Sequence, residues 1–213
     1  MAGPIGATSG KFVLIGATLL LNGRVNDIPV RLAIVPGAST SAISPDLSAR
    51  LAARRGGGDV SIHLRAETFR ARVESIEGQP STGAAIRLGQ DVLDENPIEI
   101  DFAHQRVRPL SPSEATRFER RAQPIALHHE PDGSVSVDLA GGTGTPVSAR
   151  LDLSRAVGVT MHGLNAGSAV KVGGVALPKV EVSDGPKPVV GLYALRHVRV
   201  IFDLGHDRIW VHR

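Results

Sequence analysis

The chain has 213 residues, of which 24 are basic and 21 acidic, so its net charge is only +3. It has no cysteine, which excludes disulfides, thiol catalysis and cysteine-based zinc sites. The basic residues are scattered and aromatic residues make up only 3% of the chain, so a nucleic-acid partner is not indicated. The length suits one ordinary domain or two small lobes, and the 24 glycines and 14 prolines favour short strands and turns.

The first strong signal in the chain is the apolar run at residues 12–21. Ten residues are too few to cross a membrane as a helix, and Lys11 and the Asn22-Gly23 turn signal flank the run. We therefore expect a buried strand and no membrane span. The residues before the run lack a basic region and no small-residue cleavage site follows it, so a signal peptide is not indicated.

The next segment, IVPGASTSAIS at residues 34–44, is an apolar strand that enters a Pro-Gly turn and a series of small hydroxyl residues. Many hydrolases place a nucleophile or an acid in such a turn, but this turn has Val35 at that position. Ser39 and Ser41 do not lie in a G-x-S-x-G elbow. We expect this run, with Ser44, to cap a short helix that begins near Pro45.

The sequence of the first half recurs in the second half. Residues 28–44 align without gaps with residues 145–161, and residues 88–110 align with residues 190–212. The matched pairs are Pro29 with Pro146, Val30 with Val147, Gly89 with Gly191, Leu93 with Leu195, Ile98 with Val200, Asp101 with Asp203, Arg106 with Arg208 and Val107 with Ile209. Val35 aligns with Asp152. We interpret the chain as two copies of one structural unit.

Each half is predicted to contain two strands, a special loop after the second strand, further strands, and a closing hairpin with alternating apolar residues. Short helices are expected only near residues 47–53, 92–93 and 194–195. The glycine-rich residues 141–146 lack the spacing of a phosphate-binding loop and predict a hairpin turn. The polar segment at residues 111–124 has a proline near each end and is predicted to be a linker.

Several of these segments resemble motifs of the pepsin/retropepsin-like aspartic protease superfamily, in the form of a bacterial two-lobed member. The segments are GAST (37–40), LGQDVL (88–93), IEIDFAHQRV (98–107), GLYAL (191–195) and VRVIFDLGHDRIWV (198–211). The resemblance implies an all-β, two-lobed pepsin/retropepsin-like fold with an internal pseudo-twofold repeat. It divides the chain into an N-terminal lobe at residues 12–110, the linker at 111–124 and a C-terminal lobe at 125–213.

In that superfamily two carboxylates face each other between the lobes and share one proton. The resemblance places the first carboxylate at Val35, where the acid is missing, and the second at Asp152, where it is retained. A lone carboxylate can act as a base or as an acid, but not as both in one step. The predicted cleft residues around these two positions are Pro36, Gly37, Ala38, Ser39, Leu153, Ser154 and Arg155.

The favoured prediction is a pseudoprotease that binds a peptide or protein in the interlobe cleft without cutting it. One alternative is an aspartic-type peptidase, a hydrolase that uses Asp152 with a non-standard partner or with its counterpart in a dimer. A second alternative is a structural or assembly protein with a closed cleft. No cofactor and no metal are predicted, a monomer is favoured because both lobes are in one chain, and the superfamily's members favour a periplasmic or secreted location.

Two other groups of polar residues are predicted to have no catalytic role. Asp101 and Asp203 each follow an apolar strand, and we expect them to be structural, with Arg106 and Arg208 as partners in their own hairpins. The pair His128-His129 is expected to be exposed, because neighbours in a strand point to opposite faces and no third metal ligand is evident.

Overall fold

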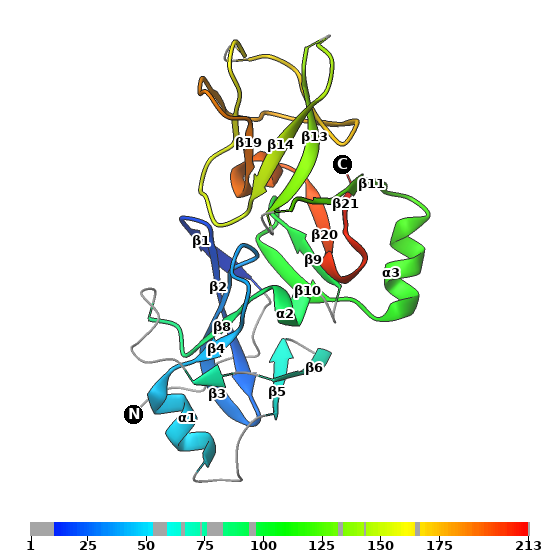
Figure 1. Cartoon of the computed structure of the whole chain (residues 1–213). Helices are drawn as coiled ribbons and strands as arrows, with labels where there is room; N and C mark the ends of the chain where they lie inside the picture. Colours follow the sequence, from blue (N-terminus) through cyan, green and yellow to red (C-terminus); the bar gives the residue numbers. More distant parts are fainter. Residues whose placement is uncertain are drawn as a thin grey trace.

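The structure, a computed structural model, consists mainly of β-strands arranged in three sheets. It describes residues 11–52, 59–64, 67–72, 74–75, 83–93, 97–131, 134–142, 144–164 and 167–212. Figure 1 shows an N-terminal sheet at one end, a C-terminal sheet at the other, and a central sheet with the helix α3 (Pro112–Glu119) beside their junction. The prediction of an all-β fold is confirmed.

The N-terminal sheet is formed by the strands that precede residue 89, in the order β6-β5-β2-β3-β8-β4-β7, with β1 paired to β2. Its strands are β1 (Phe12–Ile15), β2 (Thr18–Val25), β3 (Ile28–Ile34), β4 (Ala42–Ile43), β5 (Asp59–Leu64), β6 (Glu67–Arg72), β7 (Glu74–Ser75) and β8 (Ile86–Leu88). Two helices accompany the sheet, α1 (Pro45–Ala52) and α2 (Gln90–Leu93).

The C-terminal sheet has the order β17-β16-β13-β14-β19-β15-β18, with β12 paired to β13. Its strands are β12 (His128–His129), β13 (Val135–Gly141), β14 (Val147–Asp152), β15 (Val159–Thr160), β16 (Val170–Val172), β17 (Val175–Leu177), β18 (Val182–Ser183) and β19 (Val189–Gly191). A 3-10 helix, η1 (Leu192–Leu195), follows β19, just as α2 follows β8 in the N-terminal sheet. The two end sheets therefore match strand for strand, as the sequence repeat predicts.

The central sheet takes strands from both halves of the chain, in the order β10-β9-β20-β21-β11. Its strands are β9 (Ile98–Asp101), β10 (Arg106–Pro109), β11 (Gln123–Ala126), β20 (Arg199–Asp203) and β21 (Arg208–His212), and the 3-10 helix η2 (Leu204–His206) connects the last two in sequence. The two closing hairpins meet where β9 pairs with β20 in antiparallel register, with Ile201 opposite Glu99. This pairing joins strands from the two halves of the chain, which are distant in sequence, into one sheet.

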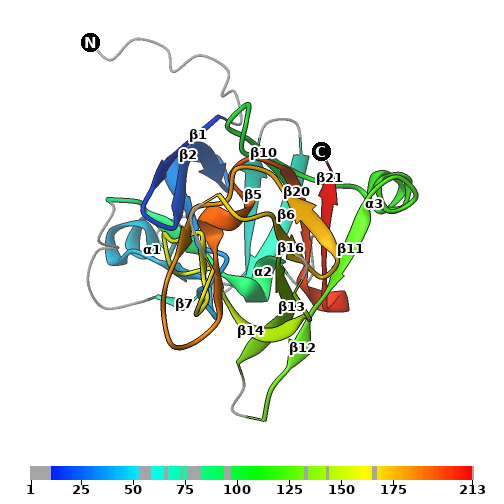
Figure 2. The same ribbon diagram turned by 90° about the horizontal axis from the view of Figure 1, so that it is seen from above.

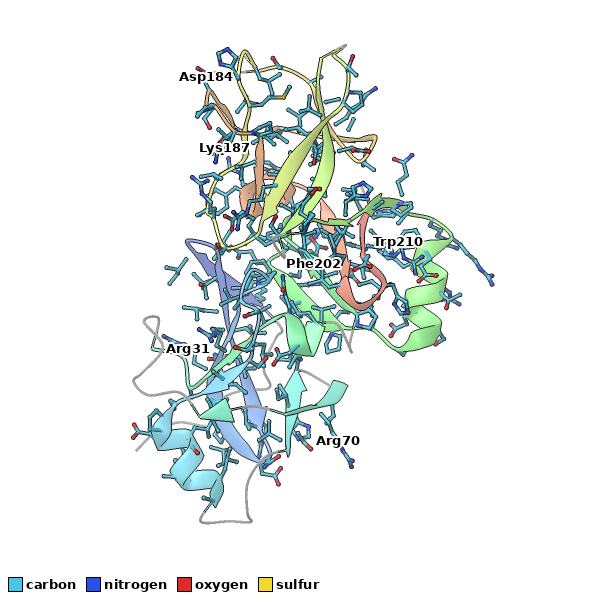
Figure 3. The ribbon with its side chains drawn as sticks, viewed as in Figure 1. Arg31, Arg70, Asp184, Lys187, Phe202 and Trp210 are labelled. Atoms are coloured by element: carbon cyan, nitrogen blue, oxygen red, sulfur yellow. The ribbon has the colours of Figure 1, made fainter. Side chains whose placement is uncertain are left out.

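The hydrophobic core runs continuously from one end sheet to the other through the central sheet. The alternating residues of the closing hairpins form its middle, with Ile98, Ile100 and Val200 fully buried and Phe202 beside them. Figure 3 shows Phe202 in the middle of the molecule and Trp210 on the side toward α3. Each such side chain contributes about 1.5–3 kcal/mol when it is removed from water.

An ion-pair network joins the two halves on the other face of the central sheet. Glu99 and Asp101 of β9 are only 6% and 7% exposed. Arg199 of β20 contacts both carboxylates, with its Nη2 2.9 Å from Asp101 Oδ2 and its Nε 3.3 Å from Glu99 Oε1. Arg108 of β10 places its Nη2 2.6 Å from Glu99 Oε2 and its Nη1 2.5 Å from Glu114 Oε1 of α3. Because buried carboxylates are costly without partners, the network favours this one register between the halves.

The aspartate that ends each closing strand is buried, in line with the predicted structural role. The predicted partner of Asp101 is wrong, however, because its carboxylate binds Arg199 and His104 rather than Arg106. Arg106 lies opposite Asp101 on β10, but the side chain that reaches the carboxylate comes from β20 on the other side of β9. The corresponding contacts of Asp203 are with His206 Nδ1 at 2.8 Å and with the predicted Arg208 at 3.9 Å.

The predicted linker contains a helix that the sequence analysis missed. Ser111 and Glu114 form a capping box at the start of α3, and each side chain accepts a backbone N–H of the other residue. Phe118 and its apolar neighbours pack on Ile201 and Trp210 of the central sheet. Figure 2 shows α3 on the outer side of β21. The segment thus connects the halves and also covers one face of the sheet that joins them.

Most of the short-range predictions are confirmed. The helix expected at residues 47–53 is α1, whose Leu47 N–H donates to Ser44 Oγ at 3.3 Å. The helical steps at residues 92–93 and 194–195 lie in α2 and η1. The loop at residues 141–146 connects the antiparallel strands β13 and β14. Among the helices in the described part of the chain, none has the length and apolar character needed to cross a membrane.

Candidate functional site

The two loops singled out by the sequence repeat occupy equivalent places in the two end sheets. The first loop (residues 35–40) follows β3, and the second loop (residues 152–157) follows β14. Ile34 of β3 pairs in parallel with Leu88, and Leu151 of β14 pairs in parallel with Val190. The residue after Ile34 is Val35 and the residue after Leu151 is Asp152, so the strand register puts these two side chains at matching positions.

The same backbone hydrogen bonds shape both loops. In each loop the residue three positions after the start donates its N–H to the first carbonyl, and its own carbonyl accepts an N–H from the helical turn that follows the paired strand. In the first loop these bonds are Ala38 N to Val35 O (2.9 Å) and Gln90 N to Ala38 O (2.7 Å), and in the second loop they are Arg155 N to Asp152 O (3.1 Å) and Leu192 N to Arg155 O (3.1 Å). The geometry of the turn therefore does not depend on the side chain at its first position.

A glycine packs closely against the backbone of each loop. A Cβ atom added at Gly89 would overlap the carbonyl oxygens of Ala38 and Thr40. A Cβ atom added at Gly191 would overlap the carbonyl oxygen of Val157 and press against that of Arg155, and these are the equivalent positions of the second loop. The sequence match of these two glycines thus reflects the same close approach of backbone to backbone in both halves.

The two loops touch each other at the junction between the halves. A Cβ atom added at Gly37 of the first loop would overlap the backbone nitrogen and the Cα atom of Ser154 in the second loop. Gly37 and Ser154 are themselves equivalent positions in the aligned halves. The first loop can approach the second this closely only because it has a glycine at the contact.

The first loop is fixed by apolar packing and by a buried serine. Val35 is partly buried and packs on a small cluster made of Leu20, Ala33 and Ala84. Ser41, 2% exposed, donates its hydroxyl to Asp91 Oδ1 at 2.6 Å and accepts the N–H of Gly89 at 2.8 Å. Asp91 also accepts the N–H of Ser41 at 2.8 Å. The side chains at this loop therefore serve its own structure.

The second loop carries a carboxylate that is only partly engaged. Asp152 is half-buried, and its Oδ1 accepts the hydroxyl of Ser154 at 2.5 Å and the N–H of Ser154 at 3.2 Å. Its Oδ2 has no hydrogen-bond partner among the described residues. One oxygen thus sets the orientation of the carboxylate, and the other is available to a ligand.

A pocket of about 250 Å³ lies beside this carboxylate. We call it the Asp152 pocket, and it is lined by Gly37, Gln90, Leu127, Ser134, Val135, Arg150, Leu151, Asp152, Leu153, Ser154 and Leu204. The first two lining residues come from the first half of the chain and the others from the second half. Arg150 and Asp152 are its charged lining residues, and Arg150 has no ion-pair partner in the described part of the chain.

The pocket brings together some of the residues predicted from the sequence and leaves others out. Four of them line it: Gly37, Asp152, Leu153 and Ser154. The remaining predicted residues lie elsewhere, with Pro36 buried, Val35 and Ala38 half-buried, and Ser39 and Arg155 exposed.

The sequence analysis missed Arg150, although a signal for it was present. It stands two residues before Asp152 on the same predicted strand, and residues at that spacing point to the same face. Gln90 and Leu204 were also missed, because they reach the pocket from distant segments of the chain. No group of three or more metal-ligating side chains occurs within the residues that the structure describes.

The chain is similar in structure to two basic 7S globulins. Conglutin gamma, a basic 7S globulin from lupine seeds, matches with a TM-score of 0.57 and 8% identity, over 96% of this chain and 94% of the globulin chain. Basic 7S globulin from soybean matches with a TM-score of 0.57 and 9% identity, over 96% of this chain and 93% of the globulin chain. No family model and no curated protein sequence matches the chain. At such low identity the similarity establishes a shared fold alone.

These comparisons contradict the predicted membership of the pepsin/retropepsin-like aspartic protease superfamily. Both matched structures are described as globulins and neither as a peptidase, so the predicted pseudoprotease function and the alternative of an aspartic-type peptidase are wrong as well. The physical reason for the error lies in the shared loop frame. The backbone bonds of the loops and the glycines at 89 and 191 account for three of the motifs on which the resemblance rested, GAST, LGQDVL and GLYAL, and they do so without the side chains of a catalytic pair.

Proposed function

We propose that the chain is a non-catalytic binding protein that holds a small polar ligand in the Asp152 pocket. The observation that carries the proposal is the pair of charges in this pocket. Arg150 and one oxygen of Asp152 line it without a partner among the described residues. Charged groups beside a concave and partly apolar wall supply specific binding energy to a ligand that complements them.

A catalytic role for the pocket finds little support in its chemistry. Asp152 is the one carboxylate among the lining residues that the structure describes, and Ser154 already occupies one of its oxygens. At the equivalent position of the first loop, Val35 packs in an apolar cluster and offers no proton donor or acceptor through its side chain. The contact between Gly37 and Ser154 leaves no space between the loops at that point.

The size of the pocket favours a smaller ligand than the peptide or protein predicted from the sequence. Sites for drug-sized ligands have volumes of about 300–1,000 Å³, and this pocket has about 250 Å³. A peptide or protein partner would therefore enter it with a single residue or a chain end. We include in this proposal a monomer with lobes at residues 12–110 and 125–213, connected through residues 111–124.

The test is a thermal-shift screen with four groups of small molecules: ammonium compounds, carboxylates, neutral polar compounds and zwitterions. Leu204→Trp places a large side chain into the pocket, and Val13→Trp, at a site 61% exposed on β1, is the matched control. We expect at least one group to raise the melting temperature of the wild type and of Val13→Trp but not of Leu204→Trp. No shift with any group, or equal shifts in both variants, would overturn the proposal.

A peptide-cleavage assay on the same preparations tests the non-catalytic part. We expect no hydrolysis that depends on Asp152. Turnover that is present in the wild type and absent in Asp152→Asn would show that the pocket is an active site.

A further inference from the structure

The two charged residues of the Asp152 pocket, neither of which makes an ion pair within the described residues, belong to one strand face. Arg150 and Asp152 are two residues apart on β14, so their side chains leave the same side of the strand about 6.6 Å apart. Building on the proposed function, we infer that the ligand is a zwitterion of the α-amino-acid type, with its ammonium group at Asp152 and its carboxylate at Arg150.

The aspartate end is prepared for a hydrogen-bond donor with positive charge. Ser154 donates both its hydroxyl and its backbone N–H to Oδ1 of Asp152, which fixes the plane of the carboxylate. The Oδ2 atom is left as an acceptor at the pocket. Hydrogen bonds between an ammonium group and a carboxylate are about twice as strong as neutral ones, so this oxygen selects an amine over a hydroxyl.

The side chain of Arg150 has the chemistry to bind a carboxylate. The guanidinium group presents paired donors whose geometry matches two carboxylate oxygens. The residue opposite Arg150 on the neighbouring strand β13 is Ser136, which donates its hydroxyl to Glu130 at 2.5 Å. Glu130 makes no ion pair with Arg150 in the described structure, so the guanidinium group is available to a ligand anion.

The remaining walls fit a short apolar side chain. Leu127, Val135 and Leu204 contribute apolar surface beside the two charges. One water molecule takes about 30 Å³ in the liquid, so the pocket's volume of about 250 Å³ is that of about eight water molecules. A compact ligand such as leucine or valine fits in that space. The charges of Arg150 and Asp152 cancel, which favours a ligand that is itself neutral overall.

The inferred site exists in one half of the molecule only. The positions equivalent to Arg150 and Asp152 are Ala33 and Val35, and both belong to the small apolar cluster of the N-terminal sheet. A single ligand per chain is therefore expected, even though the fold itself is repeated.

The experiment measures by calorimetric titration the affinities of three related probes: leucine, leucine methyl ester, which lacks the carboxylate, and N-acetyl-leucine, which lacks the ammonium group. The wild type is expected to bind leucine roughly tenfold or more tightly than either derivative. Asp152→Asn keeps an oxygen for Ser154 and should bind leucine and N-acetyl-leucine equally. Arg150→Gln should bind leucine and its methyl ester equally. A variant that is merely misfolded would weaken all three probes together.

Arg155→Gln is the matched control, because Arg155 is an exposed arginine of the same loop that does not line the pocket. It should keep the preference of the wild type for leucine. Equal binding of leucine and either derivative by the wild type would overturn the inference. A thermal-shift screen in which zwitterions do not bind and another group of molecules does would also overturn it. Those two outcomes leave the proposed binding function standing, whereas the absence of binding by every group overturns both.

Discussion

The first and second loops share one backbone and differ in what their side chains do. In the first loop, Val35 packs in an apolar cluster and Ser41 ties the loop to Asp91. In the second loop, Asp152 has one oxygen without a partner among the described residues, at a pocket that it shares with Arg150. The comparison teaches that the glycines and backbone hydrogen bonds fix the shape of the loop. The side chain at the first position of the loop, Val35 or Asp152, can then serve either packing or binding.

The largest expected effect on the free energy of unfolding comes from replacing the glycines that pack against the two loops. Gly89→Ala and Gly191→Ala each force a Cβ atom against carbonyl oxygens, and each should lower the free energy of unfolding by about 3 kcal/mol. Gly142→Ala is the control, because Gly142 has a positive φ of 58° but open space around it, and it should cost about 1 kcal/mol. Urea unfolding measures all three. A large loss at only one of the two loop glycines would break the equivalence of the halves.

The next effect concerns the contact between the halves in the central sheet. Arg199→Met removes the partner that Asp101 and Glu99 share and should cost about 2 kcal/mol, less than a fully buried pair because the arginine is 42% exposed. Arg106→Met on β10 is the control, since Arg106 is exposed and has no ion pair within the described residues. Equal midpoints of urea unfolding for the two variants would argue against a network that joins the halves.

A smaller effect compares the serines that support the two loops. Ser41→Ala leaves the buried N–H of Gly89 without its acceptor, removes one donor from the Asp91 carboxylate, and should cost about 1–2 kcal/mol. Ser154→Ala removes an exposed hydroxyl and should cost about 0.5 kcal/mol or less. Thermal unfolding at neutral pH measures both. A cost at Ser154 that exceeds the cost at Ser41 would mean that the second loop, rather than the first, is the structural one.

The smallest effect is the pH dependence of the network at the central sheet. The backbone N–H of Ser111, followed by Arg108 and the Ser111 hydroxyl, lowers the pKa of Glu114 to about 2. Burial alone would raise the pKa of Asp101, but hydrogen bonds from His104 and Arg199 outweigh it and lower that pKa. Groups with lowered pKa values stabilise the fold fully above their ordinary pKa near 4 and lose this contribution as the pH falls.

The free energy of unfolding of the wild type should therefore decrease between about pH 5 and pH 2. Glu114→Gln should show a shallower decrease over the same range, because this residue no longer binds a proton on unfolding. Urea unfolding at several pH values is the measurement. Identical slopes for the two proteins would contradict a role for Glu114 in the network.

The repeat could be predicted from the sequence because its determinants are local. The alternation in the closing hairpins and the matched glycines at 89 and 191 recur at fixed offsets, and they reflect strand faces and close backbone contacts that are the same in both halves. The helix α3 was missed because its segment is mostly polar. Its S-x-x-E capping box at residues 111–114 was a usable signal.

The features that could not be predicted depend on contacts between segments distant in sequence. The partner of Asp101 is set by the pairing of β9 with β20, which no local pattern encodes. Gln90 and Leu204 reach the Asp152 pocket from separate elements for the same reason. The assignment to a protease superfamily took the shape of the loops as evidence of a catalytic site. That shape is produced by backbone hydrogen bonds and glycine contacts, which carry no catalytic chemistry.

The central claim is that the position of Asp152 in the second loop binds a ligand and the equivalent position of the first loop, Val35, does not. Backbone amide chemical shifts followed by NMR during a titration with leucine test it most directly. We predict shifts at Gln90, Arg150, Asp152 and Ser154, with Ala33 and Val35 unchanged. Equal shifts in both loops, or shifts confined to residues outside the Asp152 pocket, would contradict it.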